Sequence, residues 1–199
     1  LTLNTYITMK ISFANMLAEL CEKIPGADAT AVAEAIGQDS RVGVKYLKPA
    51  SAYGGPCFPR DARAFQKTAE GVGVCANLAA ATQTINDRQV PRLAAKIKNL
   101  AGPDDVIGIL GLAYKEGTSC IEHSVGAMLY DLLKVLGYNV LAHDPLIDGL
   151  SAEKVIESSD IIVITTPAKE FRSLDYGDKI VIDAWGVSNA KNVIRIGKG

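Results

Sequence analysis

A single cysteine, Cys57, follows two glycines, Gly54 and Gly55, and precedes a carboxylate, Asp61, by four residues. The glycines would leave the backbone open to close approach by a ligand. The residues after Cys57 have a helical pattern, so the thiol would lie at a helix N-terminus, where the helix dipole favours the thiolate. Cys57 and Asp61 would then share one helix face, as a nucleophile beside a carboxylate that can activate water. The spacing alone also allows a loop cysteine that only packs.

The elements before Cys57 are expected to be helical. Apolar residues recur at three- and four-residue steps from Ile7 to Cys21, which is typical of an amphipathic helix. Asp28 is predicted to cap a second helix that ends near Ile36. Residues 40–57 have no such pattern and are rich in small residues. A loop of this length inside a domain is usually functional.

After the cysteine the helical pattern returns over residues 61–70 and again over residues 77–100. Pro91 predicts a kink or a break in the second of these near Gln89. Cys75 is assigned, like Cys21, to an apolar helical pattern, so we expect Cys57 to be the most reactive thiol.

The pattern changes after residues 101–105, where strands begin to alternate with helices. The expected strands are 106–112, 139–143, 161–165 and 179–183, and the expected helices are 124–136 and 152–158. Such alternation predicts a parallel sheet covered on both faces. The fold class is therefore α plus α/β. The pattern of residues 191–199 does not decide between strand and helix.

Composition excludes several classes of protein. The net charge of −1 over 199 residues leaves no basic footprint for nucleic acid. No apolar run approaches the roughly 20 residues that span a bilayer. The four cysteines form no C-x-x-C pair, which argues against a zinc site and a disulfide framework and favours a reduced, cytoplasmic protein. His123 and His143 have no partner at catalytic spacing and are expected to be structural.

The stretch from Lys45 to Asp61 resembles the active-site signature of the nucleotide-sugar 6-dehydrogenases, the UDP-glucose/GDP-mannose dehydrogenase family. Residues 4–6 and 35–43 are similar to family segments that lie upstream. The run from Gly111 to Lys115 is similar to the Gly-Leu-Ala-Phe-Lys motif at the end of a family strand. The resemblance therefore extends over nearly the whole chain.

The resemblance implies an NAD-dependent enzyme that oxidises the primary alcohol of a nucleotide sugar to an acid, as in polysaccharide biosynthesis. Cys57 would form a thiohemiacetal and then a thioester, Asp61 would help to activate the hydrolytic water, and Asn4 would hydrogen-bond the reacting oxygen. The implied substrate-binding residues lie in the cysteine loop and after the first strand: Arg41, Tyr46, Leu47, Lys48, Tyr53, Gly54, Tyr114 and Lys115.

The family's domain plan implies two domains for this chain. Residues 1–101 would form a central helical domain that carries the catalytic cysteine and forms a homodimer, and residues 102–199 a Rossmann-like UDP-sugar-binding domain. Family members carry an NAD-binding domain, and a catalytic lysine, before the asparagine matched by Asn4. We therefore interpret the chain as a carboxy-terminal fragment whose NAD is bound mainly by an amino-terminal domain, and no cofactor residue is assigned. The alternative is a nucleotide-sugar-binding and dimerisation module without its own catalysis.

Two departures from the family pattern leave the sugar, the base and the way NAD is held open. Glu122 and Trp185 stand where the family has arginines. Asp144 ends a predicted strand where dinucleotide folds hold a ribose-binding acid, although Asp-Pro also favours turns and we prefer a capping role. Without the resemblance, Lys115 would be interpreted as a solvated surface lysine.

Overall fold

The computed structural model describes every residue from Leu1 to Gly199 and divides into two compact units. The helical unit comprises Leu1–Gln89 and Ile196–Gly199, and the sheet unit comprises Val90–Arg195. The division falls after Gln89, earlier than the expected boundary after residue 101, because the last helix before the sheet belongs to the sheet unit.

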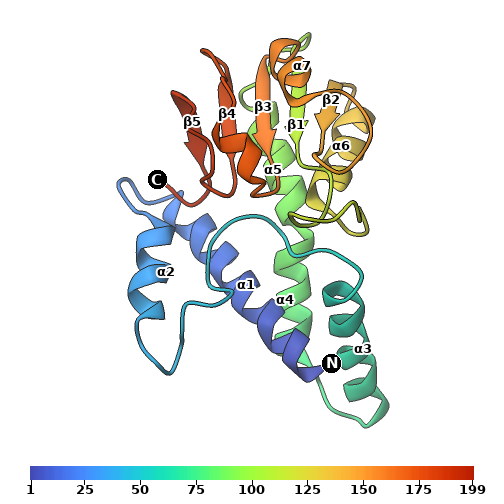
Figure 1. Cartoon of the computed structure of the whole chain (residues 1–199). Helices are drawn as coiled ribbons and strands as arrows, with labels where there is room; N and C mark the ends of the chain where they lie inside the picture. Colours follow the sequence, from blue (N-terminus) through green and yellow to red (C-terminus); the bar gives the residue numbers. More distant parts are fainter. The chain divides into compact units, whose positions relative to one another are not determined.

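Four helices form the helical unit (Figure 1): α1 (Thr2–Cys21), α2 (Ala29–Gly37), α3 (Phe58–Gly71) and α4 (Asn77–Asp87). Helix α1 contacts each of the other three. The carboxylate of Asp28 accepts from the N–H groups of Thr30 and Ala31, at 2.9 and 3.4 Å, so the predicted cap of α2 is confirmed. The segment between α2 and α3 has no regular secondary structure, as expected of residues 40–57.

The predicted long helix over residues 77–100 is broken. It consists of α4 and a separate helix, α5 (Gln89–Lys98), with the interruption at Arg88. Pro91 lies in the first turn of α5, where a missing N–H costs no intrahelical hydrogen bond. The helix is therefore interrupted where Pro91 predicts it, near Gln89.

The chain's last residues return to the helical unit beside the end of α1 (Figure 1). The N–H of Ala29 donates to the carbonyl of Gly197 at 2.8 Å, and the N–H of Gly197 donates to the carboxylate of Glu22 at 2.9 Å. Gly197 has a φ of +82°, and a Cβ there would lie 2.8 Å from the side chain of Ala29. Only glycine fits this position.

The sheet unit contains five parallel strands in the order β2-β1-β3-β4-β5. The strands are β1 (Val106–Leu110), β2 (Asn139–His143), β3 (Ile161–Ile164), β4 (Ile180–Asp183) and β5 (Asn192–Arg195). The connecting elements are α6 (Val125–Val135), α7 (Ala152–Glu157) and the 3-10 helix η1 (Lys169–Arg172). From β1 the chain adds β2 on one side and then β3 to β5 on the other. The boundary between β1 and β3 is therefore the topological switch point, where open α/β sheets bind ligands.

Both faces of the sheet are buried, as predicted. Leu110, Ile162 and Ile164 pack with Val155 of α7 and with Phe171 of η1. The alternate strand residues point to the opposite face, and they too are buried: Ile107, Ile109, Ile161, Val163 and Ile182. This pattern is typical of a parallel sheet between helical layers. No helix is both long enough and apolar enough to cross a bilayer, and no group of His, Cys, Asp and Glu side chains could hold a metal ion.

Candidate active site

Cys57 lies immediately before α3, at the N-cap position of that helix. Its thiol is exposed and makes no capping hydrogen bond. The N–H of Asp61 donates to the carbonyl of Cys57 at 2.8 Å, which closes the first turn of α3. The thiol is therefore open to a reactant at the positive end of the helix.

Asp61 lies one turn after Cys57, and its buried carboxylate has two side-chain partners. Asn4 on α1 donates to Oδ2 at 2.7 Å, and the guanidinium of Arg60 donates to Oδ1 at 2.9 Å. These hydrogen bonds, first that of Asn4 and then that of Arg60, hold the pKa of Asp61 below its ordinary value. The carboxylate therefore stays ionised at neutral pH. It is better suited to orient a water or an adjacent cation than to take up a proton.

The structure thus brings together the three residues that the sequence assigns to catalysis. Asn4 and Asp61 are hydrogen-bonded to each other, and Cys57 precedes Asp61 by one helical turn. Arg60 is a further member of the group to which the sequence analysis gave no role. Its only signal in the sequence is its place beside Asp61.

Aromatic rings surround Phe58, the residue after Cys57. The rings of Tyr46 and Tyr53 approach Phe58 edge-on, with centroids 6.4 and 6.2 Å away. Tyr46 is half exposed and has a φ of +62°, a left-handed conformation that costs a non-glycine residue energy. Such strained residues cluster at functional sites.

The other loop residues assigned to substrate binding differ in exposure. Lys48 is exposed, whereas the side chains of Leu47 and Tyr53 lie in the core. The hydroxyl of Tyr53 donates to Gln83 at 3.1 Å, and burial raises its pKa. Leu47 and Tyr53 can therefore contribute to a ligand site only through their backbone or by anchoring the loop. Gly54 is half-buried between Tyr53 and the cysteine.

Arg41 extends into solvent from the loop after α2. Its guanidinium donates to Asp39 at 2.6 Å, and 87% of its side chain is exposed. The amine of Lys10 donates to the carbonyls of Val42 and Gly43, at 2.9 and 3.0 Å, and so fixes this loop to α1.

The remaining cysteines do not all lie where the sequence placed them. Cys21 is buried in α1, as expected. Cys75 was assigned to a helical pattern and is instead exposed in the loop between α3 and α4. That assignment was wrong because apolar residues flank a turn there, in which Gly73 has a φ of +75°. Cys75 is thus a second exposed thiol, remote in sequence from the Gly-Gly pair.

In the sheet unit, the turn after β1 is held by an internal carboxylate. Asp144 accepts through Oδ2 from the N–H groups of Leu112 and Ala113, at 2.7 and 2.8 Å. Its Oδ1 accepts from the N–H of Leu146 at 3.0 Å. The capping role that we preferred for Asp144 is therefore confirmed. Gly111 opens this turn with a φ of +103°, and a Cβ there would overlap the side chain of Thr166.

A cleft of about 300 Å³ lies at the carboxyl ends of β1, β2 and β3. Its walls come from the three loops that follow these strands: Lys115, Glu116, Gly117, Thr118, Asp144, Pro145, Leu146, Thr166, Ala168, Lys169 and Glu170. Lys115, which the sequence predicted, lies here with its amine 5.4 Å from the ring centroid of Tyr114. Lys169 was not predicted, because no pattern in the sequence marks the 3-10 helix that carries it.

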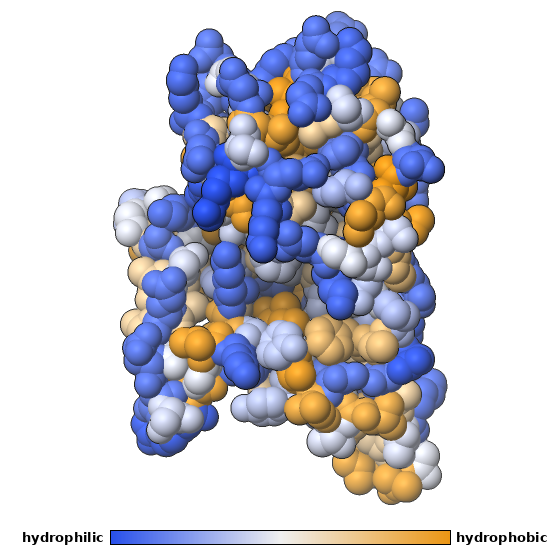
Figure 2. Space-filling model, in the orientation of Figure 1, coloured by the Kyte–Doolittle hydropathy of each residue, from blue (hydrophilic) through white to orange (hydrophobic).

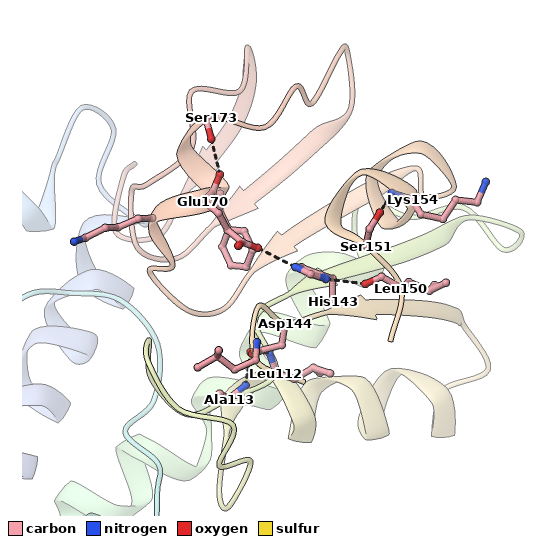
Figure 3. A network of polar contacts seen from close by, with 12 residues as sticks. Leu112, Ala113, His143, Asp144, Leu150, Ser151, Lys154, Glu170 and Ser173 are labelled. Carbon is pink, nitrogen blue, oxygen red and sulfur yellow. Dashed lines mark hydrogen bonds and ion pairs between the residues drawn. The ribbon is translucent and has the colours of Figure 1, made fainter. Parts of the chain in front are cut away.

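One histidine ties two of these loops together (Figure 3). His143, at the end of β2, faces the carbonyl of Leu150 with Nδ1 at 2.7 Å and the carboxylate of Glu170 with Nε2 at 2.9 Å. Its ring also contacts Phe171 edge-on. His143 is therefore a structural residue that holds Glu170 of the cleft wall in place, as expected from its lack of a catalytic partner. His123 is exposed.

The two positions where the family has arginines also have defined places in the structure. Glu122 is exposed in the loop before α6. Trp185 donates from its indole N–H to the carbonyl of Thr165 at 2.7 Å, so the ring is held within the sheet unit. The cation nearest to Asp183 is Arg195 of β5, which forms an ion pair with it.

Comparisons with known proteins give a consistent result. Residues 1–88 match the central domain of the UDP-glucose/GDP-mannose dehydrogenase family, and residues 108–190 match the UDP binding domain of the same family. A UDP-glucose 6-dehydrogenase of Rhizobium meliloti is 35% identical over 188 residues, covering 87% of this chain and 43% of the relative. A UDP-glucose 6-dehydrogenase of Rickettsia bellii is 33% identical and covers 98% of this chain and 50% of the relative.

Solved structures agree in fold. A UDP-glucose dehydrogenase from Pyrobaculum islandicum superposes on all of this chain and 49% of its own, with a TM-score of 0.88 and 30% identity. A UDP-D-ManNAc dehydrogenase from Pyrococcus horikoshii has a TM-score of 0.85 and 28% identity, over 98% of this chain and 50% of its own. The chain thus spans about half the length of the relatives that it matches.

Proposed function

This chain belongs to the UDP-glucose/GDP-mannose dehydrogenase family, and we propose that it carries the catalytic cysteine and the UDP-sugar site of an NAD-dependent UDP-sugar 6-dehydrogenase. The observation that carries the proposal is the placing of Asn4, Cys57 and Asp61 around the first turn of α3. All three lie within the part of the chain that matches the central domain.

In the proposed reaction, the primary alcohol of the sugar is first oxidised to an aldehyde. The sulfur of Cys57 adds to the aldehyde carbon, and the carbonyl oxygen takes up a proton to give a thiohemiacetal. Loss of two electrons and two protons converts this adduct to a thioester. Water then attacks the thioester carbon, the carbon–sulfur bond breaks, and the acid and the free thiol are released.

Within this scheme, Asp61 and Asn4 act on the oxygen atoms. The ionised carboxylate of Asp61 orients the attacking water, and Asn4 can hydrogen-bond the reacting oxygen. The two oxidations require a two-electron acceptor, for which we propose NAD. No residue of this chain is assigned to NAD, because the turn after β1, where a dinucleotide fold would hold it, is filled by Asp144.

We propose that the nucleotide diphosphate of the sugar binds in the cleft of the sheet unit. Lys115 and Lys169 supply cations on its walls, and Thr118 and Thr166 supply hydroxyl groups. Tyr114, beside Lys115, offers an aromatic ring for the base. For the helical unit, taken by itself, we assign four residues of the cysteine loop to substrate binding, with Leu47 and Tyr53 as anchors of the loop: Arg41, Tyr46, Lys48 and Gly54.

We further propose that the protein is a homodimer formed through the helical unit. Helix α1 exposes large apolar side chains along its length: Leu3, Tyr6, Phe13, Met16 and Leu20. Apolar surface also lies over the α3–α4 loop of the helical unit (Figure 2), in which Val72 and Val74 are exposed. Exposed apolar patches of this kind usually mark interfaces.

All four cysteines are free, which fits a reducing, cytoplasmic setting.

The alternative is a nucleotide-sugar-binding and dimerisation module that performs no chemistry. The observation that favours it is that Asp144 occupies the N–H groups of the turn after β1, where a dinucleotide-type fold would hold a pyrophosphate. The two functions differ in whether the exposed thiol of Cys57 is needed.

The experiment is a panel of UDP- and GDP-sugars assayed with NAD on the intact protein, in the wild type and in two cysteine variants. Cys57→Ser should lower the overall oxidation by several orders of magnitude, because a hydroxyl is a poor acyl acceptor and leaving group. Cys75→Ser removes the other exposed thiol and should change nothing. Binding of the nucleotide sugar should survive both changes. Full turnover by Cys57→Ser would remove covalent catalysis from the proposal.

A further inference from the structure

The loop that leads to Cys57 is buried, although it has no regular secondary structure. Leu47, Ala50, Ser51, Ala52 and Tyr53 are each at most 9% exposed. Connecting segments normally lie on the surface, because buried backbone groups must find hydrogen-bond partners. Within the helical unit, no backbone-to-backbone hydrogen bond involves residues 49 to 56. The loop must therefore obtain its partners from side chains.

Two buried asparagines supply these partners. Asn15 of α1 accepts from the N–H of Ala50 at 3.1 Å and donates to the carbonyl of Ser51 at 2.9 Å. Asn86 of α4 accepts from the N–H of Tyr53 at 2.8 Å and donates to the carbonyl of Tyr53 at 3.1 Å. Each carboxamide pairs with one donor and one acceptor of the loop, as a neighbouring strand would.

Both asparagines are buried, and both direct their carboxamides at the loop backbone. Asn15 is 1% exposed and Asn86 is 6% exposed, and both use the carboxamide oxygen and nitrogen on the loop backbone. An apolar side chain of the same size would fill the space equally well but would leave four loop groups without partners. We propose that Asn15 and Asn86 are positioning residues, which hold the loop so that Cys57 is fixed at the start of α3.

The contacts lead from the asparagines to the thiol. Asn86 fixes the backbone of Tyr53, and the ring of Tyr53 packs edge-on against Phe58, the residue after Cys57. Between these two anchors lie Gly54 and Gly55, which are the most flexible residues that the chain can use. The Gly-Gly pair is thus fixed from both sides, and without the upstream anchor only its attachment to α3 restrains its backbone. Covalent catalysis tolerates little displacement of the nucleophile, so this restraint matters to the reaction proposed above, on which the inference rests.

The test compares substitutions at three buried polar residues, two that bond the loop and one that does not. Asn15→Leu and Asn86→Leu fill the space without hydrogen bonding, and Asn15→Ser and Asn86→Ser are milder versions in case the leucines fail to fold. Ser12→Ala is the matched control, because the 1%-exposed hydroxyl of Ser12 donates to the carbonyl of Thr82 at 2.9 Å and joins α1 to α4 without touching the loop.

The first measurement is amide hydrogen exchange of the 199-residue chain, followed by mass spectrometry of the peptide covering residues 48–57. We expect exchange about tenfold faster or more in the asparagine variants, well below the melting temperature, and no local change in Ser12→Ala. Equal exchange in all variants would show that the asparagines only fill the core and would overturn the inference.

The second measurement is steady-state oxidation of nucleotide sugar by the intact protein. The asparagine variants should lose about 10- to 100-fold in kcat with KM for the nucleotide sugar nearly unchanged, and Ser12→Ala should lose neither. An unchanged kcat in a variant with faster exchange would also overturn the inference. Hydrogen exchange needs no activity, so a wild type that binds but does not oxidise would refute only the proposed function.

Discussion

Asp183, at the end of β4, offers a sharp test of how a buried carboxylate holds the sheet unit together. Its side chain is 1% exposed and accepts five hydrogen bonds. Oδ1 accepts from the N–H groups of Trp185 and Gly186 at 3.0 and 2.7 Å. Oδ2 accepts from the N–H and hydroxyl of Ser188 at 2.7 and 2.8 Å, and also forms the ion pair with Arg195.

The substitution Asp183→Asn keeps the size but turns one oxygen into a donor. Whichever way the amide is oriented, its N–H₂ group faces backbone N–H donors, and Arg195 loses its counter-charge. Breaking a buried pair costs about 3–5 kcal/mol. A domain of this size loses roughly 4–8 °C of melting temperature per kcal/mol, so the sheet unit should melt at least about 12 °C lower. Total stability is only about 5–15 kcal/mol, so this is a large share of it.

The assay is urea unfolding followed by fluorescence, because Trp185 is the only tryptophan and reports on the sheet unit. Circular dichroism provides a second signal that does not depend on the indole's surroundings. Asp178→Asn is the matched control, since its side chain is 93% exposed and 3.9 Å from Lys191, and it should cost less than about 0.5 kcal/mol. A loss for Asp183→Asn no larger than that of the control would refute the reasoning, because it would mean that burial of the pair cancels its attraction.

Three further outcomes follow from the two candidate sites. In the intact protein, Asp61→Asn should slow thioester hydrolysis more than thioester formation, so intact-protein mass spectrometry should detect an acyl adduct on Cys57; a variant that turns over without the adduct would contradict the role of Asp61. Lys115→Ala should weaken UDP binding by about 10- to 100-fold in calorimetry, as loss of a charge-assisted contact predicts, whereas the exposed Lys134→Ala on α6 should leave it unchanged. The pKa of Asp61 in the folded protein lies below its ordinary value of 3.8, so the ionised carboxylate stabilises the fold above pH 3.8. This contribution is lost as the pH falls through the pKa of the folded protein. The free energies of unfolding of the wild type and Asp61→Asn, measured in urea, should therefore differ least at the most acidic pH.

The sequence predicts those features whose cause is local. Asp28 caps α2 because a carboxylate at that position reaches the next N–H groups, and Pro91 ends a helical run because its ring excludes the preceding helix geometry. Likewise, the cysteine loop is predicted because it is rich in small residues and its apolar residues do not recur at helical or strand spacing. The motif of Cys57 and Asp61 also carries its own geometry, because four residues make one helical turn.

The features that the sequence does not predict depend on partners far along the chain. Asn15 and Asn86 lie in helices, where a buried asparagine has no sequence pattern to distinguish it from an exposed one, and their partners are 33 to 36 residues away. The last residues return to the helical unit through Gly197, whose carbonyl accepts from Ala29 and whose N–H donates to Glu22, and both partners lie more than 160 residues earlier in the chain. The structure divides after Gln89, whereas the boundary was expected after residue 101, because the kink or break predicted near Gln89 was taken to lie within one domain.

The sheet unit shows how a dinucleotide-type fold can be made unsuitable for a dinucleotide. In such folds the N–H groups after the first strand hold a pyrophosphate. Here the same groups, those of Leu112 and Ala113, donate to the buried carboxylate of Asp144. A pyrophosphate could bind there only by displacing a group of its own charge, which carries a hydrogen bond from Leu146 as well. The N–H groups of this turn are therefore not free for an anionic ligand, and the cations that we propose for one are Lys115 and Lys169 on the cleft walls.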